Sequence, residues 1–226
     1  MVETSLSKVV QSLVENDSSV QDALERGYGN FSAIARLLKP QVEEILEKKV
    51  SLEGLITAVK RAKTSFSPRL DYVKIIAGSV INLRTDVARV SLEKTRRTLE
   101  KARLLSADFP EAFFQVLEGA TTLTLIIDQK IFNDVSPAFR NEEKLDEKQN
   151  LAAIIVQSPK DIVDTPGCIA ALYSPISRRQ INIEETISCF TETVIVLRME
   201  DAARAFSLLT ELIANTRRTV RTGKEA

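Results

Sequence analysis

Histidine is absent from the 226-residue chain. Its absence removes the usual general base, the Ser-His and Cys-His nucleophilic pairs, and nearly all catalytic zinc sites. The seven glycines are scattered, so the chain has neither a G-x-x-x-x-G-K-S/T phosphate loop nor a G-x-G-x-x-G nucleotide motif. No segment gathers lysines or carboxylates into a catalytic constellation. We therefore expect a protein that is not an enzyme and that uses no metal or cofactor.

Cysteines and long apolar runs are also scarce. The two cysteines, Cys168 and Cys189, form no C-x-x-C pair, which suits a reducing compartment. No apolar run approaches the ~20 residues of a membrane helix, and residues 1–19 are polar and acidic, unlike a signal peptide. Acidic and basic residues balance at 31 each, so the chain is not a basic protein. We expect a cytoplasmic protein with no membrane partner.

The most informative stretch spans residues 162–182. Its D-T-P-G sequence at residues 164–167 predicts a tight corner, because Asp and Thr bond nearby backbone, Pro presets φ and Gly permits close approach. Apolar residues at helical spacing then predict a helix over 168–179, and I-N-I at 181–183 begins a strand. Free amides at a helix N-terminus attract a carboxylate, which makes the corner a candidate ligand site. The alternative is that Pro166 and Gly167 only shape a turn. At the same helix start, we expect Cys168 to be a small packed residue rather than a thiol with a depressed pKa.

This pattern, D-x-P-G followed by a short helix, I-N-I, a hairpin and a second helix, resembles the ACT domain. The similarity is closest to the regulatory ACT domains of aspartokinases and covers Leu151 to Ile213, with the third strand at 192–198 and the second helix at 200–213. The resemblance implies binding of a small effector, usually an amino acid, between paired copies. It assigns ligand binding to Asp164, Thr165, Pro166, Gly167, Cys168, Ile169, Asn182 and Ile183.

Residues 1–64 predict a helical domain with the rhythm of a helix-turn-helix. Apolar stripes mark a first helix from residue 4, a second at 19–26, a third from 31 that Pro40 interrupts, and a last one from 51. In a DNA reader, the third helix would contact DNA through Asn30, Ser32 and Arg36. However, residues 1–64 hold nine basic and nine acidic side chains, whereas DNA readers normally need a cationic surface. A helical interaction or dimerisation module is therefore kept as an equal alternative to a DNA reader.

Beyond a boundary at residues 64–68, the pattern predicts strands at 72–77, 80–90, 112–117 and 122–127. It also predicts a basic helix at 92–105 and a short helix at 129–139. The part from residue 80 can be laid over 151–213 without a gap, with residue 80 on residue 151, which predicts a duplication whose first copy lacks the corner. Residues 141–150, nearly all charged or amide, predict a solvated linker. The fourth strand of the second copy is left open between residues 216–221 and the first copy.

The predicted fold is α+β: a helical, helix-turn-helix-like domain at 1–64, a degenerate ACT-like domain at 70–140 and an ACT domain at 150–222. The two βαββαβ units would form antiparallel sheets with helices on one face. The predicted function is regulation of amino acid metabolism by a homo-oligomer that binds an amino acid effector, acting on DNA as a transcriptional regulator or on a protein. The alternative is a non-catalytic oligomerisation or interaction module that binds no ligand.

Overall fold

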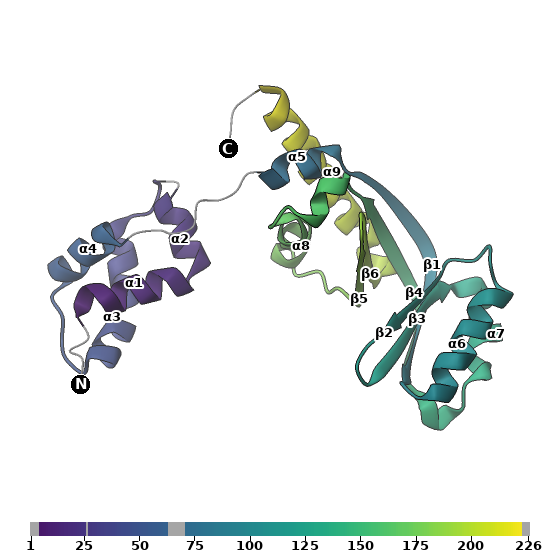
Figure 1. The fold of residues 1–226 in the computed structure, drawn as a ribbon. Helices are drawn as coiled ribbons and strands as arrows, with labels where there is room; N and C mark the ends of the chain where they lie inside the picture. Colours follow the sequence, from purple (N-terminus) through teal and green to yellow (C-terminus); the bar gives the residue numbers. More distant parts are fainter. Residues whose placement is uncertain (1–4, 26, 63–70, 223–226) are drawn as a thin grey trace. The chain divides into compact units, whose positions relative to one another are not determined.

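The computed structural model describes residues 5–25, 27–62 and 71–222. The chain divides into two compact units, residues 1–69 and 70–226 (Figure 1). The boundary predicted at residues 64–68 lies outside the described residues.

In its described part, the first unit consists of short helices around one core. These are α1 (Leu6–Asn16), α2 (Ser18–Glu25), α3 (Phe31–Leu46) and α4 (Leu52–Arg61). Two of these helices are capped by side chains, since the side-chain oxygen of Asp17 accepts from two amides of α2 and that of Asn30 from two amides of α3. The buried core is Val9, Val10, Val14, Val20, Ile34, Ala35, Leu38, Val42, Leu55, Ala58 and Val59.

The interruption predicted at Pro40 is wrong, because α3 runs through it. A proline inside a helix removes one backbone hydrogen bond and costs about 3 kcal/mol. Here Pro40 lies on the exposed side, while Leu38 and Val42 on the opposite side are fully packed. Burial of that continuous apolar face holds the helix together across the proline.

The second unit begins with a helix and continues as alternating strands and helices. In order, its elements are α5 (Asp71–Gly78), β1 (Val80–Glu93), α6 (Arg96–Asp108), β2 (Phe114–Glu118), β3 (Thr122–Asp128), η1 (Gln129–Ile131), α7 (Phe132–Val135), η2 (Ser136–Ala138), η3 (Asn141–Glu143), β4 (Lys144–Gln157), η4 (Lys160–Val163), α8 (Cys168–Arg178), β5 (Glu185–Cys189), β6 (Glu192–Arg198) and α9 (Met199–Thr222).

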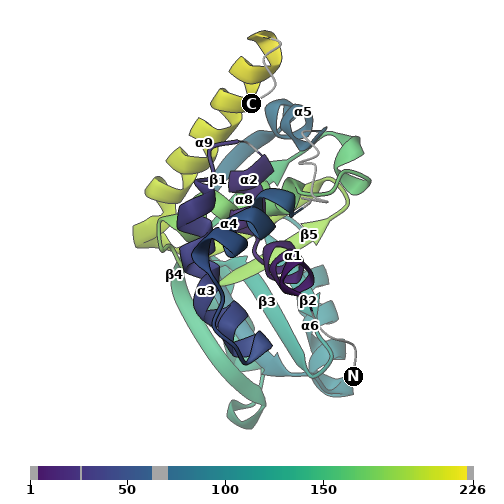
Figure 2. The ribbon, with the colours of Figure 1, turned by 90° about the vertical axis from the view of Figure 1, so that its left-hand side faces the viewer.

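The strands form one six-stranded antiparallel sheet in the order β2-β3-β1-β4-β6-β5. The two central strands, β1 and β4, run through both halves of the sheet (Figure 1). On one face, α6 and α7 pack on the half that contains β2 and β3, while α5, α8 and α9 pack on the other half. The long helix α9 follows one side of the sheet and extends past it beside α5 (Figure 2).

The opposite face of the sheet carries a smaller buried apolar cluster. Its members come from the four inner strands, and Phe113, Leu117, Ile155 and Ile187 pack against them. The cluster comprises Val87, Ile126, Leu151, Ala153, Val194 and Val196.

The two halves of the sheet match each other about an approximate two-fold axis. β1 runs from residue 80 to 93 and β4 from residue 144 to 157, so the two strands superpose end to end without a gap. In this superposition Arg84 falls on Lys148 and Arg89 falls on Ala153. A two-fold rotation that places β1 on β4 therefore places the pair Arg84–Ala153 on the pair Lys148–Arg89.

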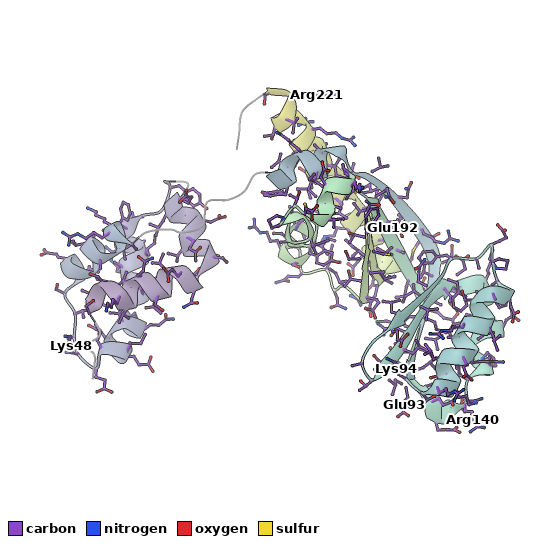
Figure 3. All side chains as sticks on the ribbon, viewed as in Figure 1. Lys48, Glu93, Lys94, Arg140, Glu192 and Arg221 are labelled. Atoms are coloured by element: carbon purple, nitrogen blue, oxygen red, sulfur yellow. The ribbon has the colours of Figure 1, made fainter. Side chains whose placement is uncertain are left out.

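The irregularities of the two central strands repeat as well. Each strand bulges at a residue with positive φ, Asp86 at 57° and Asn150 at 59°. These two residues also occupy equivalent positions when β1 is laid on β4. Glu93 at the end of β1 and Glu192 at the start of β6 lie toward opposite ends of the sheet (Figure 3). The similarity between β1 and β4 thus includes their departures from regular pairing.

The predicted gapless alignment of residue 80 with residue 151 holds for β2 and β5, which begin at 114 and 185, but not for β1 and β4. The discrepancy lies between the strand and the helix that follows it. Residues 158–167 connect β4 to α8, whereas only Lys94 and Thr95 connect β1 to α6. The corner is therefore extra chain in the second half.

Two further expectations are corrected by the structure, and one question that the sequence left open is answered. Residues 72–77 are helical, because Tyr72, Ile75 and Ile76 have the spacing of one buried helical face. Residues 141–150 are no linker but η3 and the first half of β4. The fourth strand beside β4 is the first part of β1, in which residues 80–84 pair with residues 153–157. Residues 216–221 belong to α9.

Candidate ligand site

The corner between β4 and α8 is built by local hydrogen bonds. After the turn η4, the Thr165 hydroxyl donates to the carbonyl of Asp161 at 2.7 Å, and the amide of Asp164 bonds the same carbonyl at 3.3 Å. Gly167 then has φ +90°, a conformation that L side chains rarely adopt. Asp164, Pro166 and Gly167 are exposed, so the corner faces solvent.

The start of α8 is open. No side chain caps it, and the first backbone hydrogen bond at this end runs from Ala171 to the carbonyl of Gly167 at 2.9 Å. The amides of Cys168, Ile169 and Ala170 therefore lie ahead of the helical ladder. Such amides, together with the positive end of the helix dipole, favour an anion.

The matching helix of the first half is closed. The Thr95 hydroxyl accepts from the amide of Thr98 at 3.1 Å, and the Thr98 hydroxyl accepts from the amide of Thr95 at 2.9 Å. This reciprocal capping box bonds the amide of Thr98, the third residue of α6, whose counterpart in α8 is the open amide of Ala170. The two halves thus differ in their capacity to hold an anion at the helix start.

Helix α5 forms the inner wall of the corner. Ile75 packs with Ile162 and Cys168, and Tyr72 packs against the same cluster. A Cβ atom added at Gly167 would lie 3.6 Å from Cδ1 of Tyr72. Sequence reasoning missed Tyr72 as a site residue because residues 72–77 were expected to form a strand, and only a helical reading of their apolar spacing could have found it.

Cys168 is 1% exposed, and burial raises the pKa of its thiol above the ordinary value of 9.0. A raised pKa keeps the thiol neutral and unreactive at neutral pH. The expectation that Cys168 is a small packed residue is confirmed.

Asn182 and Ile183 lie at the other end of α8. Asn182 is exposed and Ile183 is half-buried against the core beneath the helices. The helix has 11 residues and is therefore about 16 Å long. The corner residues 164–169 are brought together, but one small ligand cannot touch both the corner and Asn182 of the same chain.

Glu184, next to Ile183, fixes this second segment to the central strands. Its carboxylate accepts from Nζ of Lys148 at 2.6 Å and lies 3.5 Å from Nη1 of Arg89, which also donates to the Glu184 carbonyl at 3.0 Å. The Glu184 side chain is only 8% exposed. Arg89, whose Nε is buried without a described partner, also pairs with Asp146. These contacts are long-range, so no local sequence signal could identify them.

The candidate DNA contacts on α3 have different surroundings. The Asn30 side chain is occupied as the cap of the helix, at 3.0 and 3.1 Å from the two amides. Ser32 is half-buried, and Arg36 is exposed. Lys39 forms an ion pair with Glu43 at 3.6 Å.

The described residues contain neither a membrane-spanning helix nor a metal cluster. No helix in the ranges given above is long and apolar enough to cross a membrane. Within the same ranges, no group of three His, Cys, Asp or Glu side chains could hold a metal ion.

Comparison with solved structures identifies the architecture. Aspartate kinase from Synechocystis is similar with a TM-score of 0.51 and 14% identity, over 61% of this chain and 27% of that one. The regulatory subunit of aspartate kinase from Thermus flavus is similar with a TM-score of 0.50 and 13% identity, over 58% of this chain and 95% of that one. The sheet and its helices have an ACT-like fold.

The ACT resemblance predicted from D-x-P-G and I-N-I is thus confirmed at the level of fold. No protein-family model and no curated protein matches the sequence. At 13–14% identity, the similarity concerns the fold and does not transfer a ligand.

Proposed function

We propose that this chain is a cytoplasmic regulator of amino acid metabolism that senses an amino acid at the corner formed by residues 164–169. The observation that carries the proposal is the open start of α8. There the effector's carboxylate would accept hydrogen bonds from the amides of Ile169 and Ala170. The exposed carboxylate of Asp164 is placed on the same corner and would pair with the effector's ammonium group.

The proposal includes a paired assembly. Since Asn182 and Ile183 lie about one helix length from the corner, they reach an effector only if another copy supplies them. The ACT resemblance implies such sites between copies. We infer also that the two halves of the sheet are two ACT-like copies, an inference supported by the end-to-end superposition of β1 on β4 and by the twin bulges at Asp86 and Asn150.

Helix α5 offers a route from the corner to the rest of the chain. Its Tyr72 and Ile75 pack on the corner, and its first residue, Asp71, is the second residue of the second unit. An effector that changes the packing of Tyr72 would therefore shift the element that leads into the first unit. This contact supports effector-dependent output.

The output partner is proposed to be a protein rather than DNA. The exposed side of α3 carries Leu37 and Ile45, and Arg36 is its exposed cation ahead of the C-terminal turn. A helix that reads DNA instead presents polar and cationic groups to phosphates and base edges.

Binding of each of the twenty amino acids to the intact protein tests the proposal. We expect one class of amino acid to bind, and Gly167→Val to weaken its affinity at least 10-fold, because valine is strained at φ +90° and would distort the corner at the start of α8. The matched control is Gly27→Val, which imposes similar strain at φ +72° in the first unit with nothing within 4 Å. Null isotherms for all twenty would support the ligand-free alternative. Equal affinity in Gly167→Val would place the site elsewhere.

A further inference from the structure

The first part of β1 forms an open edge of the sheet. β3 pairs with β1 only from Val87 onward, and among the described strands β4 alone pairs with residues 80–84 (Figure 1). The bulge at Asp86 ends this stretch. On the side away from β4, its outward-pointing amides and carbonyls have no strand to bond, and such an edge is a template for another strand.

The equivalent edge of β4 is protected by charge, whereas this edge is not. Laying β1 on β4 places residues 80–86 on residues 144–150, which precede the part of β4 that pairs with β6. That second edge, K-L-D-E-K-Q-N, carries four charged side chains. The edge of β1, V-I-N-L-R-T-D, carries two, and it exposes Val80 and Leu83 by 56% and 37%. Charged side chains discourage the addition of a strand, and β-branched and apolar ones favour it.

A hollow of about 320 Å³ lies beside the start of the open edge. It is bordered by Ile81 and by residues of α9, among them Phe206 and Ile213. Ile81 packs against the helix-covered core, and Leu83 points to the same face because side chains alternate along a strand. A strand that fits this edge would therefore place an apolar side chain opposite Ile81, where the hollow can receive it.

A second copy of the same edge meets this requirement. When it is laid antiparallel about a two-fold axis at Asn82, residues 80–84 of one copy oppose residues 84–80 of the other. Leu83 of each copy then stands opposite Ile81 of the other, and this apolar contact forms twice. On the other face Arg84 stands opposite Val80, so no charge opposes a like charge.

We infer that residues 80–84 of β1 are a self-pairing edge whose occupant is the same edge of a second copy of this chain. The pairing joins two six-stranded sheets into one. Two-fold symmetry uses up the edge in both copies, so assembly through it stops at the dimer. A contact of this length is smaller than a standard protein interface, so association is expected at micromolar concentration.

Disulfide trapping in the full chain tests the pairing. Asn82→Cys in a Cys189→Ser background places two Cβ atoms about 5 Å apart across the axis, and mild oxidation should cross-link them. The control is Ser188→Cys in the same background, because Ser188 is exposed on the edge strand β5. We expect Asn82→Cys to cross-link at least 10-fold faster. Equal rates, or faster cross-linking at residue 188, would overturn the inference.

A lysine on the edge then tests the contact at the hollow. Leu83→Lys places a charge opposite Ile81 of the other copy and should raise the dimer dissociation constant at least 10-fold, measured by analytical ultracentrifugation. The matched control is Leu145→Lys, since Leu145 is an exposed leucine on the equivalent edge of β4, and it should leave the constant unchanged.

Two results would contradict self-pairing at this edge. A chain that stays monomeric at high micromolar concentration would leave the edge to a strand of another protein. A dimer that Leu83→Lys and Leu145→Lys weaken equally would place the contact between copies on another surface. The inference goes beyond the proposed function and does not depend on the effector, so the second result leaves the amino acid proposal standing.

Discussion

Arg217 holds α5 in place, and its replacement gives a quantitative test of how this helix is docked. From α9, its Nε donates to the carbonyl of Ala77 at 2.8 Å and its Nη2 donates to the carbonyl of Ser79 at 2.9 Å. These carbonyls lie at the C-terminal end of α5, where a cation also interacts favourably with the negative end of the helix dipole. The perturbation is Arg217→Met, which keeps an unbranched apolar stem and removes both hydrogen bonds.

The size of the effect follows from the surroundings of the two bonds. A hydrogen bond from a charged group contributes about 1.5–3 kcal/mol when it is protected from water. Here the bond to Ala77 is exposed and the bond to Ser79 is partly buried, so solvent weakens both. We expect Arg217→Met to lower the free energy of opening α5 by about 2 kcal/mol in total, which is about 30-fold in the opening equilibrium.

Amide hydrogen exchange over residues 71–79 measures this opening directly. Exchange should accelerate about 30-fold in Arg217→Met, since about 1.36 kcal/mol corresponds to a factor of ten. Arg218→Met is a matched control, because the neighbouring Arg218 is exposed and its side chain has no described partner. The reasoning is refuted if exchange in the two variants agrees within about 3-fold, since Arg217 would then contribute no more than a surface arginine.

The corner and the first unit give three further predictions. Iodoacetamide should modify exposed Cys189 at pH 8 long before buried Cys168. Burial raises the pKa of the Cys168 thiol. The stability that this thiol contributes is therefore complete below its ordinary pKa of 9.0 and is lost as pH rises through the raised value. Cys168→Ala should remove this pH dependence of the free energy of unfolding. Duplex DNA should not bind at low salt with or without the effector. Affinity that falls as salt rises, measured by titration at two salt concentrations, would instead support a DNA reader.

Much of the fold could be predicted from local pattern. Helix α8 and strand β6 fall within one or two residues of their expected bounds, because apolar spacing and the D-T-P-G corner are signals carried by neighbouring residues. The caps at Asp17 and Asn30 were predictable for the same reason. The corner residues 164–169 were found by their sequence, since a proline and a glycine mark a turn wherever they stand.

The first half of β4 could not be predicted because its stability is non-local. Lys144 to Asn150 is polar and would suit a linker, yet residues 144–148 pair with β1. Arg89 pairs with Asp146, Lys148 pairs with Glu184, and the hydroxyl of Ser136 accepts from Lys144 at 2.7 Å. A charged strand is stable when its charges find partners, and those partners are up to 57 residues away in sequence.

The asymmetry between the halves bears on how many effectors one chain can hold. If the halves are two copies, their helix starts are equivalent positions, but Thr95 and Thr98 close the start of α6 with their own hydroxyls. The longer connection before α8 and Gly167 at φ +90° leave the start of that helix open. A donor already bonded inside its own cap is not available to a carboxylate. The isotherm of the intact protein should therefore saturate at one amino acid per chain, and saturation at two would mean that the capping box opens to accept a ligand.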